Sequence, residues 1–136
     1  MYNHTIHITQ ADAAKLRDLI RDTHIPGEAL NPHLAALNAE LDRAVIIDSR
    51  EIPADVITMN SQAHLEDMET GEEMHFSLVF PESADSQQGK ISILAPVGTA
   101  TLGYRAGDVF EMQTPGGVRK LKIVRVLYQP EASGDE

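Results

Sequence analysis

The apolar residues after Thr9 follow the pattern of a short amphipathic helix. Leu16, Leu19 and Ile20 recur three and four residues apart, which places them on one helical face. Thr9 and Asp12 have the spacing of a capping box, and an aspartate is favourable near the positive end of a helix. The sequence therefore predicts a helix that begins just after Thr9, with room for a short strand before it.

A second amphipathic pattern follows a break. The sequence HIPG at residues 24–27 interrupts the first helix, and Asn31 and Pro32 then supply an N-cap and a first-turn proline. The apolar seam behind them consists of Leu34, Leu37 and Leu41. Two short helices joined by a turn predict an antiparallel helical hairpin, a small coiled coil. Each arm has about 14 residues at most, so the hairpin projects about 20 Å.

Beyond a polar connector at residues 49–55, the apolar pattern changes from helical spacing to the alternation typical of strands. We therefore divide the chain into an N-terminal helical hairpin, residues 1–49, and a C-terminal domain, residues 50–136. The fold class expected is α+β, with an antiparallel sheet and one short helix at residues 95–103. The expected strands cover residues 56–59, 63–68, 73–80, 90–94, 109–113 and 118–129.

Two local features of this domain are also predicted. Pro115 and Gly116 read as the central pair of a type II turn, in which Gly116 would take a positive φ. Residues 132–136 read as an acidic tail without fixed structure.

The net charge of −10 indicates which binding partners to expect. Phosphate backbones are bound mainly by Lys and Arg, so free nucleic acid is not expected to bind, and a basic protein surface is favoured. The densest basic group lies on an alternating segment and reads as a solvated strand face; it consists of Arg119, Lys120, Lys122 and Arg125. There is no apolar run of about 18 residues, no signal-like N-terminus and no cysteine, so a cytoplasmic location without membrane contact is expected.

The sequence offers little catalytic chemistry. It lacks a glycine-rich phosphate loop and the HExxH spacing of zinc enzymes, and Ser61 near His64 does not make a nucleophile–base pair with an orienting group. The acidic residues at 66–73 lack calcium-loop spacing and read as a solvated turn. We therefore expect no enzyme activity, no catalytic residues, no metal site and no cofactor.

Several segments together resemble a known family. They are LNAELDRA at 37–44, IPADVITMNS at 52–61, LAPVGTATLG at 94–103, GD at 107–108, TPGGV at 114–118 and LYQPEASGD at 127–135. In combination they resemble the regulator of nucleoside diphosphate kinase (Rnk) family, which is related to the Gre transcript-cleavage factors of bacterial RNA polymerase. The resemblance implies a helical hairpin followed by an FKBP-like domain. It also implies docking of that domain at the rim of the polymerase secondary channel, with the hairpin pointing toward the active site.

The resemblance implies a docking turn in this chain. Gre factors have an Asp-Ser-Pro turn just before the short helix, and the matching positions here are Leu94, Ala95 and Pro96, followed by Val97. Only the proline is retained, and it also suits the first turn of a helix. We therefore expect these four residues to contact polymerase through apolar surface.

The resemblance also directs attention to the hairpin tip. Gre factors carry an acidic pair there that helps to hold a second Mg²⁺ during transcript cleavage, whereas this tip loop has only Glu28, with Asp22 at the end of the preceding helix. The expected function is to dock at the channel and compete with Gre factors without stimulating cleavage, with any effect on nucleoside diphosphate kinase indirect. One alternative is a true Gre-type cleavage factor. Another, from the FKBP-like fold, is a prolyl isomerase, although the chain has no Trp and only three Phe and three Tyr to line its pocket.

Overall fold

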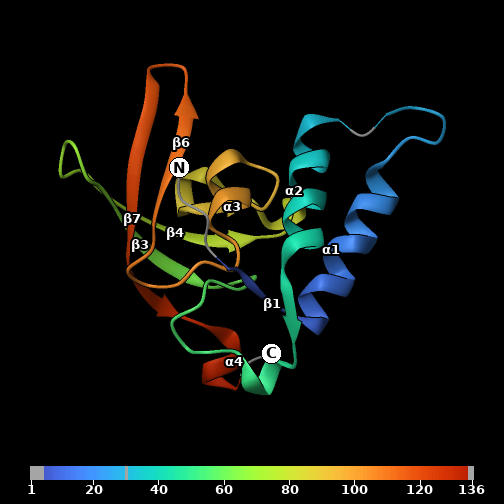
Figure 1. Ribbon diagram of the computed structural model, residues 1–136, viewed down its shortest axis with the longest axis horizontal. Helices are drawn as coiled ribbons and strands as arrows, with labels where there is room; N and C mark the ends of the chain where they lie inside the picture. The colour runs from blue at the N-terminus through green and yellow to red at the C-terminus, as the bar shows by residue number, and fades with distance from the viewer. Residues whose placement is uncertain (1–4, 30, 135–136) are drawn as a thin grey trace.

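The computed structural model describes residues 5–29 and 31–134, except for the side chain of Gln113. The helices α1 and α2 lie on one side of the molecule, the main sheet lies on the other, and α3 lies between them (Figure 1). The expected α+β class, with a mostly antiparallel sheet, is confirmed. The coiled-coil and FKBP-like features of that expectation stay predictions.

The two N-terminal helices begin at the caps that the sequence predicts. Helix α1 spans Gln10–Thr23, and the Oγ1 of Thr9 accepts a hydrogen bond from the backbone N of Asp12 at 3.1 Å. Helix α2 spans Pro32–Arg43, and the Oδ1 of Asn31 accepts from the backbone N of Leu34 at 2.9 Å. Each cap satisfies an N–H group that the first turn of a helix leaves free.

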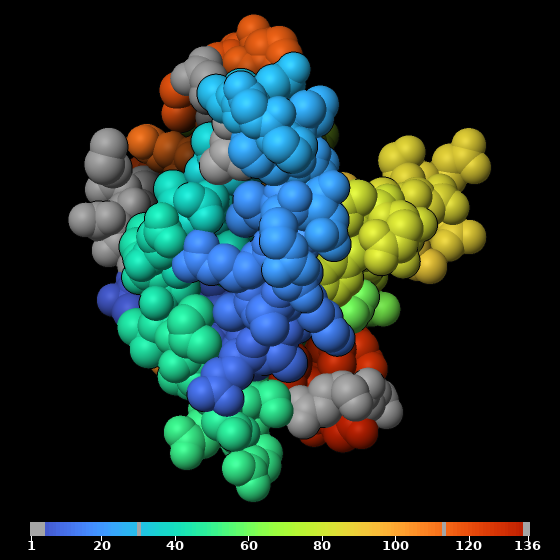
Figure 2. Space-filling view, turned by 90° about the vertical axis from the view of Figure 1, so that its right-hand side faces the viewer, coloured from blue at the N-terminus to red at the C-terminus, as the bar shows by residue number. Residues whose placement is uncertain are grey.

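The helices α1 and α2 lie side by side and run in opposite directions (Figure 1). Arg17 on α1 links them, because its guanidinium donates to Asn38 at 2.9 Å and to Asp42 at 3.0 Å. In the space-filling view α1 (blue) lies along the front of the molecule, with the loop that follows it (light blue) at its upper end (Figure 2). Among the described residues, no helix has both the length and the apolar character needed to span a bilayer.

Within the described residues, the main sheet has the strand order β5-β4-β3-β7-β6. Strand β5 pairs in parallel with β4, and the other neighbours pair antiparallel. The strands are β3 (Gln62–Asp67), β4 (Glu73–Val79), β5 (Lys90–Ser92), β6 (Val109–Thr114) and β7 (Gly117–Tyr128). The short helices are α3 (Pro96–Thr101) and α4 (Pro130–Ser133), and single 3₁₀ turns occur at Ser49–Glu51, Pro81–Ser83 and Ser86–Gln88.

Two strand assignments made from the sequence need correction. Strand β1 (His7–Thr9) pairs in parallel with β2 (Val45–Ile47), a strand that the sequence pattern did not predict. Residues 56–59, expected as a strand, form only an isolated bridge between Val56 and Arg105 and then a turn. All four of these residues are buried, so the segment lies inside the core instead of alternating between core and solvent.

Two local predictions near the C-terminus also need correction. The positive φ in the β6–β7 turn belongs to Gly117, at 120°, and not to Gly116, so the predicted type II turn is wrong. The segment expected as a tail begins inside α4, because Pro130 starts a helical turn and the side chain of Glu131 accepts from Thr58 at 2.7 Å. Residues 135–136 of that predicted tail lie outside the described residues.

The apolar faces of the N-terminal helices join the apolar face of the sheet in a common core. From α1 and α2 this cluster takes Leu16, Ile20, Leu34, Leu37 and Leu41. From the rest of the chain it takes Ile57, Met59, Leu65, Phe76, Leu78, Ile93, Leu102, Phe110, Leu121 and Ile123, among others. The segments on either side of the predicted boundary at residue 49 therefore share their packing, and that boundary itself stays a prediction.

Replacement of Leu37 by alanine tests the shared core. Leu37 is fully buried, so its loss should lower the free energy of unfolding by about 2–5 kcal/mol. The exposed Leu127 is the matched control, and Leu127→Ala should change that free energy by about 1 kcal/mol or less. Urea unfolding followed by circular dichroism and by tyrosine fluorescence should show one transition for both probes. Separate transitions, with only the helical one shifted by Leu37→Ala, would contradict a common core.

Candidate functional site

The turn at residues 94–97 follows β5 and includes the first two residues of α3. Pro96 is the first residue of α3, and Ala95 is its N-cap with an extended backbone, at φ −72° and ψ 151°. The backbone N of Leu94 donates to the Oγ of Ser92 at 3.0 Å. Pro96 is exposed, whereas the other three residues are half-buried. The turn therefore presents a small apolar surface with Pro96 at its centre, while its neighbours pack partly against the rest of the protein.

Close packing holds this turn against the sheet. At Gly98 in α3, a Cβ atom would lie 2.4 Å from the backbone O of Ser92, which is too close for any side chain. At Gly103 a Cβ would lie 2.8 Å from the Cβ of Ile6, and φ is +82°. These two glycines of the segment LAPVGTATLG therefore allow α3 and the loop after it to approach the strands closely. The position of the turn is fixed by backbone packing instead of by a side-chain cap.

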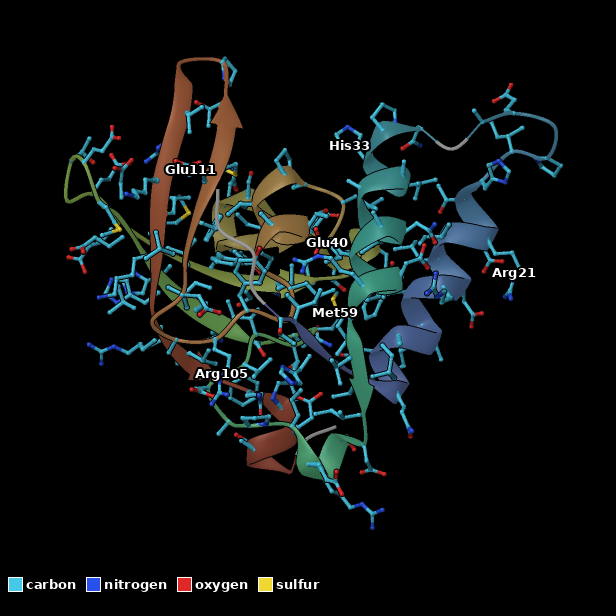
Figure 3. The ribbon with its side chains drawn as sticks, in the orientation of Figure 1. Arg21, His33, Glu40, Met59, Arg105 and Glu111 are labelled. Carbon is cyan, nitrogen blue, oxygen red and sulfur yellow. The ribbon has the colours of Figure 1, made fainter. Side chains whose placement is uncertain are left out.

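A groove separates α3 and its turn from α2. Its volume is about 320 Å³, and it is lined by Pro32, His33, Ala36, Glu40, Leu94, Pro96, Thr99 and Ala100. Figure 3 shows Glu40 pointing from α2 toward α3, with His33 nearer the end of α2 where that helix begins. Sequence reasoning found Leu94 and Pro96 but missed the residues of α2, because nothing in the pattern placed α2 beside α3.

The carboxylates named for the hairpin tip lie on different elements. Asp22 is in the last turn of α1, exposed, and 3.5 Å from the guanidinium of Arg21. Glu28 is exposed in the loop, where its backbone N donates to the O of Ile25 at 3.1 Å and its backbone O contacts the ring of His24. Among the residues that the structure describes, no hydrogen bond or ion pair joins Asp22 to Glu28.

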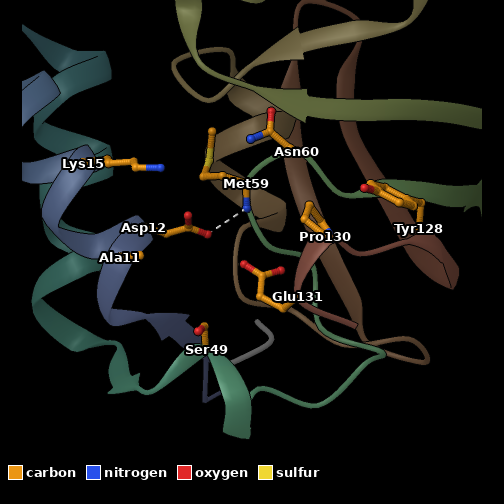
Figure 4. Close-up of a pocket in the computed structure, with 9 residues that line it drawn as sticks. All are labelled: Ala11, Asp12, Lys15, Ser49, Met59, Asn60, Tyr128, Pro130 and Glu131. Carbon is orange, nitrogen blue, oxygen red and sulfur yellow. Dashed lines mark hydrogen bonds between the residues drawn. The ribbon is translucent and has the colours of Figure 1, made fainter. Parts of the chain in front are cut away.

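A second cavity, of about 510 Å³, lies where α1 meets the sheet (Figure 4). At its wall the Oδ2 of Asp12 accepts a hydrogen bond from the backbone N of Met59 at 3.1 Å. Asp12 is only 7% exposed, and this burial raises the pKa of its carboxyl to about 6. The bond from Met59 offsets part of that rise, while the nearby carboxylate of Glu131 adds to it.

Asp12 therefore does more than the sequence predicted for it. The spacing from Thr9 identified the start of a helix correctly, but the carboxylate bonds the turn at Met59 and so ties α1 to the sheet domain. A partner 47 residues away leaves no signal in a local pattern. The donor is a backbone N–H group, which nearly every residue carries, so the residue type at position 59 holds no signal for this bond either.

One member of the basic group on β7 has acidic partners. Arg119 forms ion pairs with Asp67 at 2.8 Å and with Glu72 at 3.2 Å, so this member of the basic group is not simply solvated. Backbone N–H donors, chiefly that of Glu69, and the Arg119 guanidinium lower the pKa of Asp67.

Ser61 and His64 do not pair. The Oγ of Ser61 accepts from the backbone N of Thr58 at 2.9 Å, whereas His64 stacks on His75 with ring centroids 4.3 Å apart. Among residues 5–29 and 31–134, no three side chains of the His, Cys, Asp or Glu type are arranged to hold a metal ion.

The comparisons with known proteins first define a class. Residues 52–128 match the family model "Transcription elongation factor, GreA/GreB, C-term", and residues 5–47 match "Rnk N-terminus". A solved structure, the prokaryotic transcription elongation factor GreA/GreB from Nitrosomonas europaea, is 41% identical with a TM-score of 0.74, over 93% of this chain and 100% of that one. The GreA factor homolog 1 (Gfh1) of Thermus thermophilus is 25% identical with a TM-score of 0.50, over 92% of this chain and 100% of that one. The fold is thus that of GreA/GreB-type transcription factors.

Within that class, the relatives identify a family. The regulator of nucleoside diphosphate kinase of Escherichia coli (strain K12) is 41% identical over 132 residues, which cover 96% of this chain and 95% of that protein. The chain belongs to the regulator of nucleoside diphosphate kinase family. The transcription elongation factor GreA of Clostridium beijerinckii is 40% identical over 86 residues, and these span only 54% of that protein.

The raised pKa of Asp12 leads to a prediction on stability. Between about pH 4 and pH 6 the folded state holds a proton that the unfolded state has released, so the contribution of Asp12 to stability falls as the pH rises. The shift from 3.8 to about 6 corresponds to about 3 kcal/mol at most. Asp12→Asn keeps an acceptor for Met59 but cannot ionise, so it should lack this loss.

Urea unfolding of both proteins from about pH 4 to pH 7 measures the effect. The free energy of unfolding of Asp12→Asn minus that of the unmodified chain should increase across this range and then level off. Asp18→Asn, at an exposed carboxylate of the same helix, is the control for the loss of one negative charge from α1. A constant difference for Asp12→Asn would show that Asp12 does not hold the proton.

Proposed function

We propose that this chain binds bacterial RNA polymerase at the secondary channel and competes there with Gre factors without stimulating transcript cleavage. It would do so in the cytoplasm and without catalysing a reaction. The observation that carries the proposal is a GreA/GreB-type globular fold joined to helical arms that are short and poor in carboxylates at the tip.

The apolar docking turn supports binding without the polar residues of Gre factors. Leu94, Ala95, Pro96 and Val97 present little beyond carbon atoms, and Pro96 is exposed at the start of α3. Protein interfaces commonly rely on a few apolar anchors within a polar rim. In the proposed complex, shape complementarity at this turn replaces the hydrogen bonds that an Asp-Ser pair would supply.

The reach of the hairpin argues against cleavage. Helix α1 has 14 residues and α2 has 12, which correspond to about 21 Å and about 18 Å at 1.5 Å per residue. A carboxylate coordinates Mg²⁺ only at about 2 Å, so a tip that stops several ångströms short contributes nothing to the metal. Such a hairpin still occupies the channel, and occupancy alone excludes a Gre factor.

The composition of the hairpin tip also argues against transcript cleavage. Two-metal chemistry needs carboxylates that converge on the metal ion. Glu28 is the carboxylate of the tip loop, and Asp22 lies in the last turn of α1 beside Arg21. An effect on nucleoside diphosphate kinase would then be indirect and would pass through transcription.

The buried positions of the aromatic rings argue against the prolyl isomerase alternative. Tyr104 and Phe110 pack edge to face in the core, with ring centroids 5.8 Å apart, and both are at least nine-tenths buried. Rings used in this way do not line an open pocket for a proline substrate.

A backtracked elongation complex made with purified polymerase tests the proposal directly. The protein alone should leave the transcript uncut, and in excess it should slow the cleavage driven by an added Gre factor. Glu28→Ala should inhibit as well as the unmodified chain, because obstruction requires bulk and not a tip charge. Transcript shortening is read on a gel. Cleavage by the protein alone that disappears in Glu28→Ala would establish a true cleavage factor instead.

The docking turn can be tested by placing a long charged side chain within it. Ala95→Arg should weaken binding to core polymerase by about tenfold or more, because it disrupts a small apolar contact. Ala84→Arg, at an exposed alanine that belongs neither to the turn nor to the groove, should bind normally. The melting temperatures of both variants should stay close to that of the unmodified chain. Equal binding by the two variants would remove this turn from the interface.

A further inference from the structure

We propose that this chain forms a weak symmetric dimer, in which the open edge of β2 pairs antiparallel with the same edge of a second copy. The dimer is independent of the function proposed above, because it requires no polymerase. Pairing would join two sheets of two strands each into one sheet of four strands. Sheets of three or more strands are more stable in water than isolated pairs of strands.

The edge of β2 that faces away from β1 has no strand partner among the described residues. The backbone N of Val45 donates to the O of Ile6 at 2.9 Å, so the backbone groups of Val45 point toward the β1 side. Successive residues of a strand direct their N–H and C=O groups to opposite edges, so those of Ile46 point away from β1. Ile46 therefore offers a donor and an acceptor in the geometry that another strand requires.

The residue types of β2 favour pairing with a strand. Val45 is 43% exposed and Ile46 is 42% exposed, and both are β-branched residues of the kind that strands prefer. Edge strands that must stay unpaired usually carry a charged residue or a proline. The edge strands of the main sheet follow that rule, since β5 contains Lys90 and β6 contains Glu111. Strand β2 has only apolar residues and lacks this protection.

The direction of the backbone groups selects the register of the dimer. In an antiparallel pair, residues that point toward the partner must lie opposite residues that also point toward it. A two-fold axis through Ile46 meets this condition, because Ile46 of one copy then lies opposite Ile46 of the other. Val45 of each copy lies opposite Ile47 of the other, and cross-strand pairs of β-branched residues stabilise a sheet.

The charges around β2 favour a second copy as the partner. Each chain has a net charge of −10, so two copies repel each other over most of their surface. The segment DRAVIIDSR at residues 42–50 is locally neutral, with the charged residues Asp42, Arg43, Asp48 and Arg50. Asp42 and Arg50 stand four positions before and after Ile46, so antiparallel pairing sets Asp42 of one copy toward Arg50 of the other. Their side chains are 63% and 85% exposed and can reach a second copy.

Sedimentation equilibrium of the full chain measures the dimer. A strand of three residues gives an interface below about 1,200 Å², so we expect a dissociation constant between about 10 µM and about 1 mM. The data over that range should fit a monomer–dimer equilibrium. In nuclear magnetic resonance spectra, the amide proton of Ile46 should move downfield as the concentration rises, because it becomes hydrogen-bonded in the dimer.

A pair of matched substitutions tests the position of the interface. Ile46→Lys should raise the dissociation constant of the dimer by about tenfold or more, because the two-fold axis sets the two lysines face to face. Val118→Lys is the control, since Val118 is also β-branched and 53% exposed but lies on β7. It adds the same charge and should change the dissociation constant by about twofold or less. Circular dichroism should show the same fold for both variants.

A charge reversal tests the partner without changing β2 itself. Arg50→Glu should raise the dissociation constant by about threefold or more, since the symmetric dimer contains the pair with Asp42 twice. The double variant Asp42→Lys, Arg50→Glu should recover the dissociation constant of the unmodified chain, because each pair is restored with opposite signs. The pairs that these residues form within one chain, with Arg17 and Asp48, lie at the surface and contribute little to stability.

Two results would overturn the proposed dimer. A chain that stays monomeric at every concentration would show that a second copy does not occupy the edge of β2. A dimer that Ile46→Lys and Val118→Lys weaken equally, with no shift of the Ile46 amide proton, would place the contact on another surface. If Ile46→Lys does not fold, the amide shift and the Arg50→Glu series decide the question on their own.

Discussion

The packing of α1 and α2 into the same apolar core as the sheet fixes the direction of both helices relative to the sheet. Without that packing the arms would be a separate projection, free to point in any direction from the globular part. Leu16 and Leu37, on the two arms, are fully buried together with residues of the sheet. The bond from Met59 to Asp12 adds a polar link at the same junction. The direction of the arms is therefore a property of the fold.

This constraint gives the candidate site its shape. Because α2 is held against the core, its neighbouring face lies beside α3 and forms one wall of the groove. The other wall is equally fixed, since Gly98 allows α3 to approach the backbone of Ser92 more closely than any side chain would permit. The turn at residues 94–97, the groove and the short helical arms are thus held in one fixed arrangement.

Local patterns in the sequence predicted the features that are formed by residues close together in the chain, such as helix caps and turns. Thr9 and Asn31 were recognised as caps because a cap and the N–H group it bonds are three residues apart. The position of the turn between β6 and β7 was predicted for the same reason, although its type was wrong. Strand β2 was missed because its partner β1 is almost forty residues away. Residues 56–59 were predicted as a strand because their residue types favour strands, whereas all four are buried and form no ladder.

The residues of the candidate site also fall into those that the sequence predicted and those that it could not predict. The docking turn and the tip carboxylates came from a family resemblance, which the comparisons confirm at the level of the family. The groove could not be predicted, because it exists only where α2 meets α3 in space. The role of Asp12 was likewise hidden, since its bond to Met59 joins segments that no short pattern connects.

Where the hairpin tip lies on polymerase is the central question, and one measurement addresses it directly. The chain has no cysteine, so Glu28→Cys creates a unique attachment point for a hydroxyl-radical source at the tip. On a stalled elongation complex, the probe should cut polymerase segments that line the secondary channel and should leave the 3′ end of the transcript intact. Cutting at the transcript 3′ end would place the tip at the catalytic metal, and the absence of cuts in the channel would place the protein elsewhere. Either result would contradict a docked, obstructing and non-catalytic regulator.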